Sequence, residues 1–306
     1  MEGAYEWGME WIIAIQTAGS PGLKAFFEAV TFMGEEYFYL LFVPILYWSV
    51  DAATGARVGF AFLISAYVNP ILKDMFDQPR PYQINPAVSD HDVAGSGMPS
   101  GHAQSSVFVW GVLAAQVKRP WFWVFAMVMA FLIGFSRVYL GVHFPHQVLA
   151  GWAVGGVLLG LFLLLDPRIE YAVGRMSLAP QLLVTLGVPA LMAILYPHND
   201  TVSSAAVMAG FGSGLVLCRR FVPYSTAGIW WKRIVRSVVG LVVLLALYVG
   251  LSAVFPGEEA GETAAYGFRF LRYGILGLWI GLGAPWLFSV LHLLPDPEVV
   301  LESERT

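Results

Sequence analysis

Residues 99–117 read PSGHAQSSVFVWGVLAAQV, a short polar start followed by a long apolar run. Ser100 is a natural N-cap for a helix that continues to residue 117. A bilayer core requires about 20 mostly apolar residues in helical form. The stretch therefore predicts a membrane-spanning helix whose first turn carries His102 at the membrane surface.

The remainder of the 306-residue chain has the same apolar character. Hydrophobic residues make up 58% of it and charged residues only 12%, whereas a soluble domain carries about 25% charged residues. The mean hydropathy is +0.67. We therefore predict an all-α fold, a polytopic membrane helix bundle with about nine transmembrane helices. The predicted spans are approximately 35–50, 57–74, 100–117, 119–140, 146–165, 179–196, 202–218, 234–254 and 270–293.

Two shorter stretches, 5–17 and 22–33, precede the first predicted span and are separated by Ser20-Pro21-Gly22. Each is too short to cross a bilayer and carries charged residues. They are predicted to be interfacial helices, with a re-entrant hairpin as the alternative. The predicted domains are N-terminal interfacial helices (1–34), a core membrane domain (35–170) and additional C-terminal transmembrane helices (171–306).

The placement of Lys and Arg predicts the orientation. With nine spans, 11 of the 17 Lys and Arg residues fall on one side of the membrane and six on the other. The positive-inside rule then puts the N-terminus outside and the C-terminus in the cytoplasm. We expect a multi-pass protein of the cell inner membrane.

Two cations, Lys73 and Arg80, follow the second predicted span. They are seven residues apart, which places them about 10 Å apart along one face if the helix continues to Gln78. Prolines at 79 and 81 then stop the helix. Lone cations in such places are usually anchors at the membrane interface, so the pair indicates a site only in combination with other groups.

Further polar groups come from other predicted helix ends. The start at Ser100-Gly101-His102 offers unpaired backbone N–H groups and a favourable dipole to an anion. Ser136-Arg137 ends the fourth predicted span, and His143 precedes Pro145, which suits a first helical position. Taken singly, each is compatible with a helix cap or an anchor. All of them fall on the predicted outer side, so together they predict a phosphate-binding site there.

The order and spacing of these residues resemble the signature of the type 2 phosphatidic acid phosphatase superfamily. That signature reads Lys-x6-Arg-Pro, then Pro-Ser-Gly-His, then Ser-Arg-x5-His-x3-Asp. Every specified position matches except the last, where Gln147 replaces Asp. The resemblance covers about residues 35–165. The third motif, His-Phe-Pro-His-Gln from position 143, is similar to the glucose-6-phosphatase branch.

The resemblance implies a role for each motif residue. His143 would attack phosphorus and form a phosphohistidine. His102 would protonate the leaving oxygen and later activate water. Gln147, four residues after His143, would orient it through the amide oxygen. No metal and no other cofactor is implied. The residues expected to bind the substrate phosphate are Lys73, Arg80, Ser100, Gly101 and Arg137.

The expected activity is hydrolysis of a phosphomonoester or pyrophosphate at an extracytoplasmic site. Lipid phosphates, polyprenyl diphosphates and sugar phosphates all remain open as substrates, in contact with membrane lipids; no nucleic-acid partner is expected. A transporter or flippase that binds anionic headgroups without chemistry is the alternative, although a binder needs no nucleophile. Vanadate-dependent haloperoxidases, a third class, have a similar arrangement of motifs, but they are soluble, whereas this chain is predicted to be a membrane protein.

Overall fold

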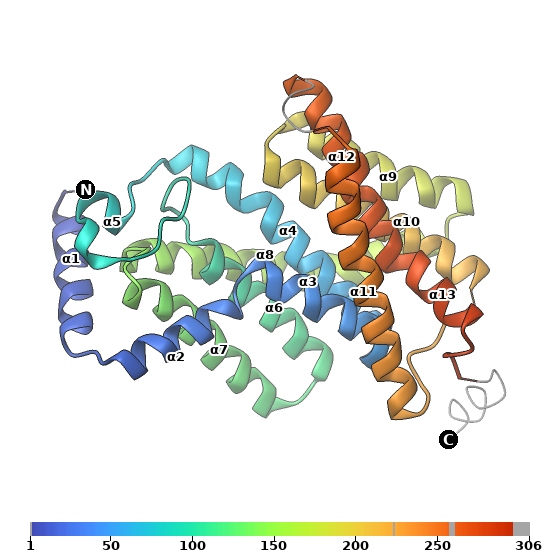
Figure 1. The fold of residues 1–306 in the computed structure, drawn as a ribbon, viewed down its shortest axis with the longest axis horizontal. Coiled ribbons are helices and arrows are strands. Elements are labelled where there is room, and N and C mark those ends of the chain that lie inside the picture. Colours follow the sequence, from blue (N-terminus) through green and yellow to red (C-terminus); the bar gives the residue numbers. More distant parts are fainter. Residues whose placement is uncertain (1, 223, 257–260, 296–306) are drawn as a thin grey trace. The chain divides into compact units, whose positions relative to one another are not determined.

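The computed structural model describes residues 2–222, 224–256 and 261–295 (Figure 1), and within these ranges it contains helices and no strand. The predicted all-α class is therefore confirmed. The chain divides into two compact units. Unit 1 contains the residues up to Leu40 together with Ile64–Asp166, and unit 2 contains Leu41–Leu63 together with the chain from Pro167 onward. The predicted functional domains remain a prediction, because these units are defined by compactness.

Unit 1 takes its helices from the N-terminal half of the chain. Three helices are shared across the division, so that α3, α4 and α8 each contribute only one part to unit 1. Its elements are α1 (Glu2–Thr17), α2 (Pro21–Phe32), the start of α3 (Glu36–Ile45), the end of α4 (Ala52–Phe76), α5 (Pro81–Ile84), η2 (Pro86–Val88), α6 (Gly101–Val117), α7 (Pro120–Tyr139) and the first part of α8 (Pro145–Gly174).

The two short N-terminal stretches form helices α1 and α2, and both pack inside unit 1. Helices α1 and α2 contact α7. Ile12 of α1 is fully buried in a cluster with Phe144 and Val148. Their position at a membrane interface remains a prediction. Their packing, however, makes them part of the wall around the residues of the three motifs.

Glycines allow α8 to approach α6 closely. A Cβ at Gly151 would lie 2.6 Å from the Ser100 carbonyl oxygen, and one at Gly155 would lie 2.5 Å from that of Gln104. Gly156 and Gly160 make no such close approach, because no described neighbour lies within 4 Å of a Cβ built at either position.

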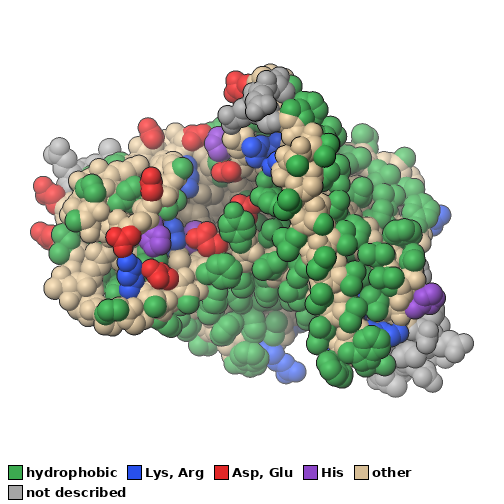
Figure 2. Space-filling model, in the orientation of Figure 1, with side chains coloured by type: hydrophobic (Ala, Val, Ile, Leu, Met, Phe, Trp, Pro, Cys, Tyr) green, Lys and Arg blue, Asp and Glu red, His purple; other side chains and the backbone are tan. Residues whose placement is uncertain are grey.

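Unit 2 contains the rest of α3 and α4, π-helix η1 (Leu46–Val50), the end of α8, and α9 (Leu178–Leu195), α10 (Asn199–Phe221), α11 (Trp230–Val254), α12 (Glu262–Leu278), π-helix η4 (Trp279–Gly283) and α13 (Ala284–Val290). Helices α10 and α12 approach so closely that a Cβ at Gly277 would lie 2.4 Å from the Val207 oxygen. Apolar side chains cover the exposed face of α11 (Figure 2), including Ile234, Val238, Val242, Leu245 and Val249. That face suits contact with lipid.

The expected count of nine spans is not confirmed. Among the described residues, seven helices are long and apolar enough to cross a membrane. An eighth results if α2 and α3–η1, which are bent by 54° relative to each other, form one broken span. The remaining difference is α6, whose 17 residues rise only about 25 Å.

Candidate active site

The three motifs occupy four helix ends in unit 1: the end of α4, the start of α6, the end of α7 and the start of α8. The backbone N–H of Ser100 donates to the Gln147 oxygen at 3.0 Å, which joins the starts of α6 and α8. The turn after α7 contains Gly141 with φ +68°, a conformation that favours glycine. A Cβ there would also collide with the Val88 oxygen at 2.0 Å. This turn directs the chain back toward the site at His143.

Arg80 lies outside the helix that carries Lys73. Helix α4 ends at Phe76, and Asp77 has φ +37°, a left-handed conformation that Asp tolerates. The expectation that Lys73 and Arg80 lie along one helix face is therefore wrong. Arg80 is instead the N-cap of α5 and is fully buried.

The Arg80 guanidinium joins two segments of the site. Its Nε donates to the Gly95 oxygen at 2.9 Å, and its Nη2 donates to the Ala94 oxygen at 3.2 Å. Its Nη1 contacts both the Val142 oxygen and His143 Nε2, each at 3.2 Å. Arg80 thus ties the loop before α6 to the turn that carries His143.

The neighbours of His143 determine which ring nitrogen carries the proton. Nδ1 lies 2.8 Å from the carbonyl oxygen of Gly97, which can only accept a hydrogen bond. Nε2 lies 3.2 Å from Arg80 Nη1, which can only donate one. The proton therefore sits on Nδ1, and Nε2 carries the free lone pair. Burial lowers the pKa of His143, and the cations Arg80, Arg137 and Lys73 lower it further, so the ring is held neutral.

Gln147 contacts His143, but it is not the closest acceptor. Its Oε1 lies 3.3 Å from Nδ1, farther than the Gly97 oxygen. The same Oε1 accepts from the Phe144 N–H at 3.1 Å, and Nε2 donates to the Pro79 oxygen at 2.9 Å. Gln147 is fully buried, and it fixes the turn around His143 from three directions.

Three buried polar atoms around the motif residues have no hydrogen-bond partner within the described part of the chain: Ser100 Oγ, His102 Nε2 and Arg137 Nε. Ser100 is the N-cap of α6, as predicted, yet its hydroxyl makes no capping bond. Buried polar groups normally have partners. These unsatisfied groups come from two helix ends, the start of α6 and the end of α7, and they are of the kind that bind an anion.

The remaining predicted residues also lie at this site. Lys73 is half-buried and close enough to both histidines to oppose positive charge on them. Gly101 begins α6 and packs against Asn69, because a Cβ would lie 2.9 Å from Asn69 Oδ1. Asn69 Nδ2 in turn donates to Gln104 Oε1 at 3.0 Å and contacts the Pro99 oxygen at 3.3 Å. The start of α6 therefore rests on a buried polar network from α4.

Sequence reasoning missed the contribution of the end of α2 and of the segment that follows it. Thr31 Oγ1 accepts a hydrogen bond from Arg137 Nη1 at 2.6 Å. Glu35 Oε1 lies 3.1 Å from His102 Nε2 and 3.8 Å from Arg137 Nη1. The signal available in the sequence was a carboxylate next to a glycine immediately before an apolar span.

His146 lies beside the motif residues without facing them. Its Nε2 pairs with Gln78 Oε1 at 3.0 Å, and its ring stacks on Phe144. No cluster of three or more His, Cys, Asp or Glu residues with metal-binding geometry occurs in the described ranges.

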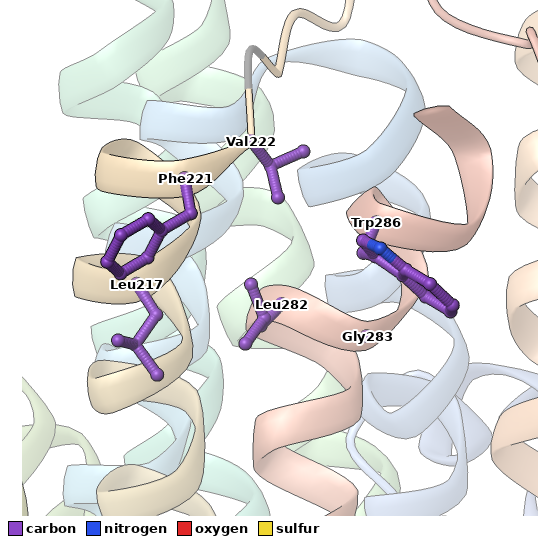
Figure 3. Close-up of a pocket in the computed structure, with 6 residues that line it drawn as sticks. All are labelled: Leu217, Phe221, Val222, Leu282, Gly283 and Trp286. Carbon is purple, nitrogen blue, oxygen red and sulfur yellow. The ribbon is translucent and has the colours of Figure 1, made fainter. Parts of the chain in front are cut away.

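Unit 2 contains a separate apolar cavity of about 530 Å³. Its lining comes from α10, η4 and α13 and includes Leu217, Phe221 and Trp286 (Figure 3). None of its lining residues is ionisable, so it offers nothing that would bind or cleave a phosphate.

Comparison with known proteins agrees with the motifs. Sphingosine-1-phosphate phosphatase 1 of Mus musculus is 24% identical over 310 residues, covering 86% of this chain and 71% of that protein. Lipid phosphate phosphatase delta of Arabidopsis thaliana is 27% identical over 179 residues, covering 53% of this chain and 43% of that protein. Glucose-6-phosphatase 3 of Rattus norvegicus is 30% identical over 175 residues, 49% of each chain. The matched region thus spans less than half of the last two relatives.

Two family models match the chain itself. The model of the PAP2 superfamily matches residues 54–170, which include all three motifs. The model described as "PAP2 superfamily phosphatase, transmembrane extension" matches residues 202–296. Together they cover more than half of the sequence, and the chain belongs to the PAP2 superfamily.

Proposed function

We propose that this protein is an integral-membrane phosphatase that cleaves a phosphomonoester or pyrophosphate through a phosphohistidine intermediate. The unsatisfied groups Ser100 Oγ, His102 Nε2 and Arg137 Nε, buried beside the histidine pair, carry this proposal. Ser100 Oγ and Arg137 Nε supply donors for the equatorial oxygens of a phosphoryl group, whose charge must be stabilised in the transition state. His102 Nε2 is available to the leaving oxygen, and the nucleophile His143 belongs to the same site.

The proposed reaction has two steps, transfer of the phosphoryl group to His143 and then to water. His143 Nε2 forms a bond to phosphorus while the bond from phosphorus to the leaving oxygen breaks. His102 gives a proton to that oxygen, and the alcohol or phosphate departs. Water then attacks phosphorus, loses a proton to His102, and releases His143 with inorganic phosphate. The lone pair at Nε2, fixed by the Gly97 carbonyl at Nδ1, suits the first step.

A phosphorylated lipid is the substrate class that we propose. Among the relatives, sphingosine-1-phosphate phosphatase 1 aligns over 86% of this chain, far more than glucose-6-phosphatase 3 at 49%. The motif residues lie at the ends of apolar helices, where a headgroup can reach them from the bilayer. Because most Lys and Arg residues fall on the opposite predicted side, the proposed site is extracytoplasmic.

A phosphate-release panel with purified protein in detergent tests this proposal. The panel contains phosphatidate, sphingosine 1-phosphate, a polyprenyl diphosphate and glucose 6-phosphate, each with and without EDTA. We expect metal-independent release, inhibited by vanadate, and a higher kcat/KM for at least one lipid than for glucose 6-phosphate. Binding of these compounds without any release would instead support the transporter or flippase. Preference for glucose 6-phosphate would refute the lipid assignment.

Paired cysteine variants test the sidedness. Asp92 is exposed in the loop before α6, and Arg119 is exposed in the turn between α6 and α7. With the native Cys218 replaced, Asp92→Cys should react with an impermeant thiol reagent in intact cells. Arg119→Cys should react only after permeabilisation. The reverse pattern would place the site in the cytoplasm.

A further inference from the structure

The segment between α2 and α3 lies outside the three motifs but forms part of the wall of the site. The break at residues 33–35 lies between two helices that are bent by 54°. Gly34 is buried against the His102 ring, because a Cβ there would lie 2.7 Å from His102 Cδ2. This close approach of the backbone brings the next residue, Glu35, to the edge of the imidazole.

Glu35 contacts His102 at the nitrogen that would deliver the proton. Its Oε1 lies 3.1 Å from His102 Nε2, yet Nε2 has no aligned hydrogen bond. The contact is therefore a close approach of charges off the N–H direction. The carboxylate can stabilise a protonated ring while the N–H remains available to a leaving oxygen.

The other charged groups around His102 oppose a proton on it. Burial of the ring disfavours its charged form, Arg137 from α7 and Lys73 from α4 repel positive charge on it, and Glu35 attracts that charge. His143 from the turn before α8 also interacts electrostatically with His102. A general acid must carry its proton before the reaction begins. Within this cationic surrounding, the carboxylate of Glu35 supplies the compensating charge.

We propose that Glu35 is a positioning residue that favours the protonated form of His102, the form that acts as the general acid, an inference that rests on the proposed function. Glu35 does not touch the reacting atoms. Thr31, four residues earlier at the end of α2, accepts a hydrogen bond from Arg137. The end of α2 and the break after it therefore contact one residue of the second motif, His102, and one of the third, Arg137.

The dependence on the leaving group tests this role. An alkyl phosphate has a strongly basic leaving oxygen that needs the proton, whereas p-nitrophenyl phosphate has a weakly basic one that needs it little. We expect Glu35→Gln to lower kcat/KM for an alkyl lipid phosphate about 10- to 100-fold, since loss of an interaction with a charged group has effects of that size. The loss for p-nitrophenyl phosphate should be much smaller. Glu35→Asp should restore most of the difference.

Two comparisons separate this role from a structural one. Glu36→Gln removes the neighbouring exposed carboxylate and should leave the ratio of the two kcat/KM values unchanged. In a His102→Ala background, Glu35→Gln should have no additional effect on the alkyl substrate. The ratio is taken within one preparation, so partial misfolding, which lowers both rates alike, does not change it.

The outcomes distinguish the two proposals. If the wild-type protein releases no phosphate from any substrate, the proposed function fails. If the wild-type protein is active and His143→Ala is not, the function stands, and Glu35 is tested alone. Two results would overturn the role of Glu35. One is that Glu35→Gln lowers kcat/KM equally for both substrates. The other is that it lowers kcat/KM as much in the His102→Ala background as in the wild type.

Discussion

The two histidines of the site lie in contrasting surroundings. His143 is almost fully buried, and its Nδ1 faces neutral acceptors, the carbonyl oxygen of Gly97 and the amide of Gln147. His102 is partly exposed and has the carboxylate of Glu35 at Nε2. Both rings lie near the same cations. The difference is therefore one of counter-charge, which only His102 has in direct contact.

This difference matches what the two proposed roles require. A nucleophile must be neutral with a free lone pair, and a neutral acceptor fixes its tautomer without favouring protonation. An acid must be protonated, and a neighbouring anion favours that form. The replacement of the family's Asp by Gln147 is consistent with this division, because Gly97 already supplies the acceptor.

Removal of the nucleophile should have the largest effect. We expect His143→Ala to lower kcat by about three orders of magnitude or more, because nucleophile and acid act as a unit. His146→Ala, which removes a neighbouring histidine that faces Gln78 and Phe144, serves as the control and should remain active. Phosphate release, together with acid-labile phosphoenzyme trapped in the wild type, is the measurement. A well-folded His143→Ala protein with normal turnover would end the assignment.

Replacement of Arg80 by lysine should have the next largest effect. The variant keeps the charge but loses the planar fork that holds Gly95, Ala94 and Val142. We expect kcat/KM to fall about 100-fold, within the range for loss of a preorganised electrostatic group. Lys73 is half-buried and binds as a single charge, so Lys73→Arg should lower kcat/KM far less. If the two variants behave alike, charge alone explains the role of Arg80.

Gln147→Leu should have a moderate effect on rate. Because Gly97 remains as the acceptor for Nδ1, we expect kcat to fall about 10-fold or less, equivalent to one weak hydrogen bond. The free energy of unfolding should fall by about 1–3 kcal/mol, since the Phe144 N–H and Pro79 oxygen lose a buried partner. Steady-state rates and thermal unfolding in detergent measure the two effects separately. A loss of several hundred-fold in kcat would show that Gln147, rather than Gly97, orients the ring.

The pH dependence provides the smallest signal. The lowered pKa of His143 means that its neutral, reactive form persists as the pH falls below the ordinary value of 6.5. The acid limb of kcat/KM that His143 causes should therefore lie below pH 6.5. The unfolded chain binds the proton more readily, so stability should also decrease as the pH falls below 6.5. The measurement is kcat/KM from pH 5 to 8, corrected for substrate ionisation. A fall to half the maximal kcat/KM near pH 6.5 would contradict the predicted position of the acid limb.

The sequence predicted the helices well, because their apolar lengths and caps are local signals. The predicted 100–117 and 119–140, for example, correspond to α6 (Gly101–Val117) and α7 (Pro120–Tyr139). The motif residues were selected by their specific spacing, and the structure brings them together at the helix ends of unit 1; their roles remain predictions. Arg80 was misplaced because the left-handed Asp77 ends α4 earlier than the prolines suggest.

Other parts of the site could not be predicted from local patterns. The acceptor at Gly97 is a backbone oxygen, and every residue has one, so only the folded chain shows which oxygen faces His143. Glu35 was the first residue of the predicted span 35–50, where a charge suits the membrane interface equally well, and its role depends on the bend between α2 and α3. The close approach of α10 and α12 depends on glycines facing each other from distant segments.

The contact between Arg80 Nη1 and His143 Nε2 has a consequence for selectivity. The lone pair that would attack phosphorus accepts a hydrogen bond from Arg80, so an electrophile must displace that donor before it can react with His143. A ligand gains access to it only by offering Arg80 a better acceptor. A phosphate dianion does this, because guanidinium binds phosphate with paired, charge-assisted hydrogen bonds. A neutral alkylating reagent cannot, and should modify His143 slowly even when it is small enough to enter.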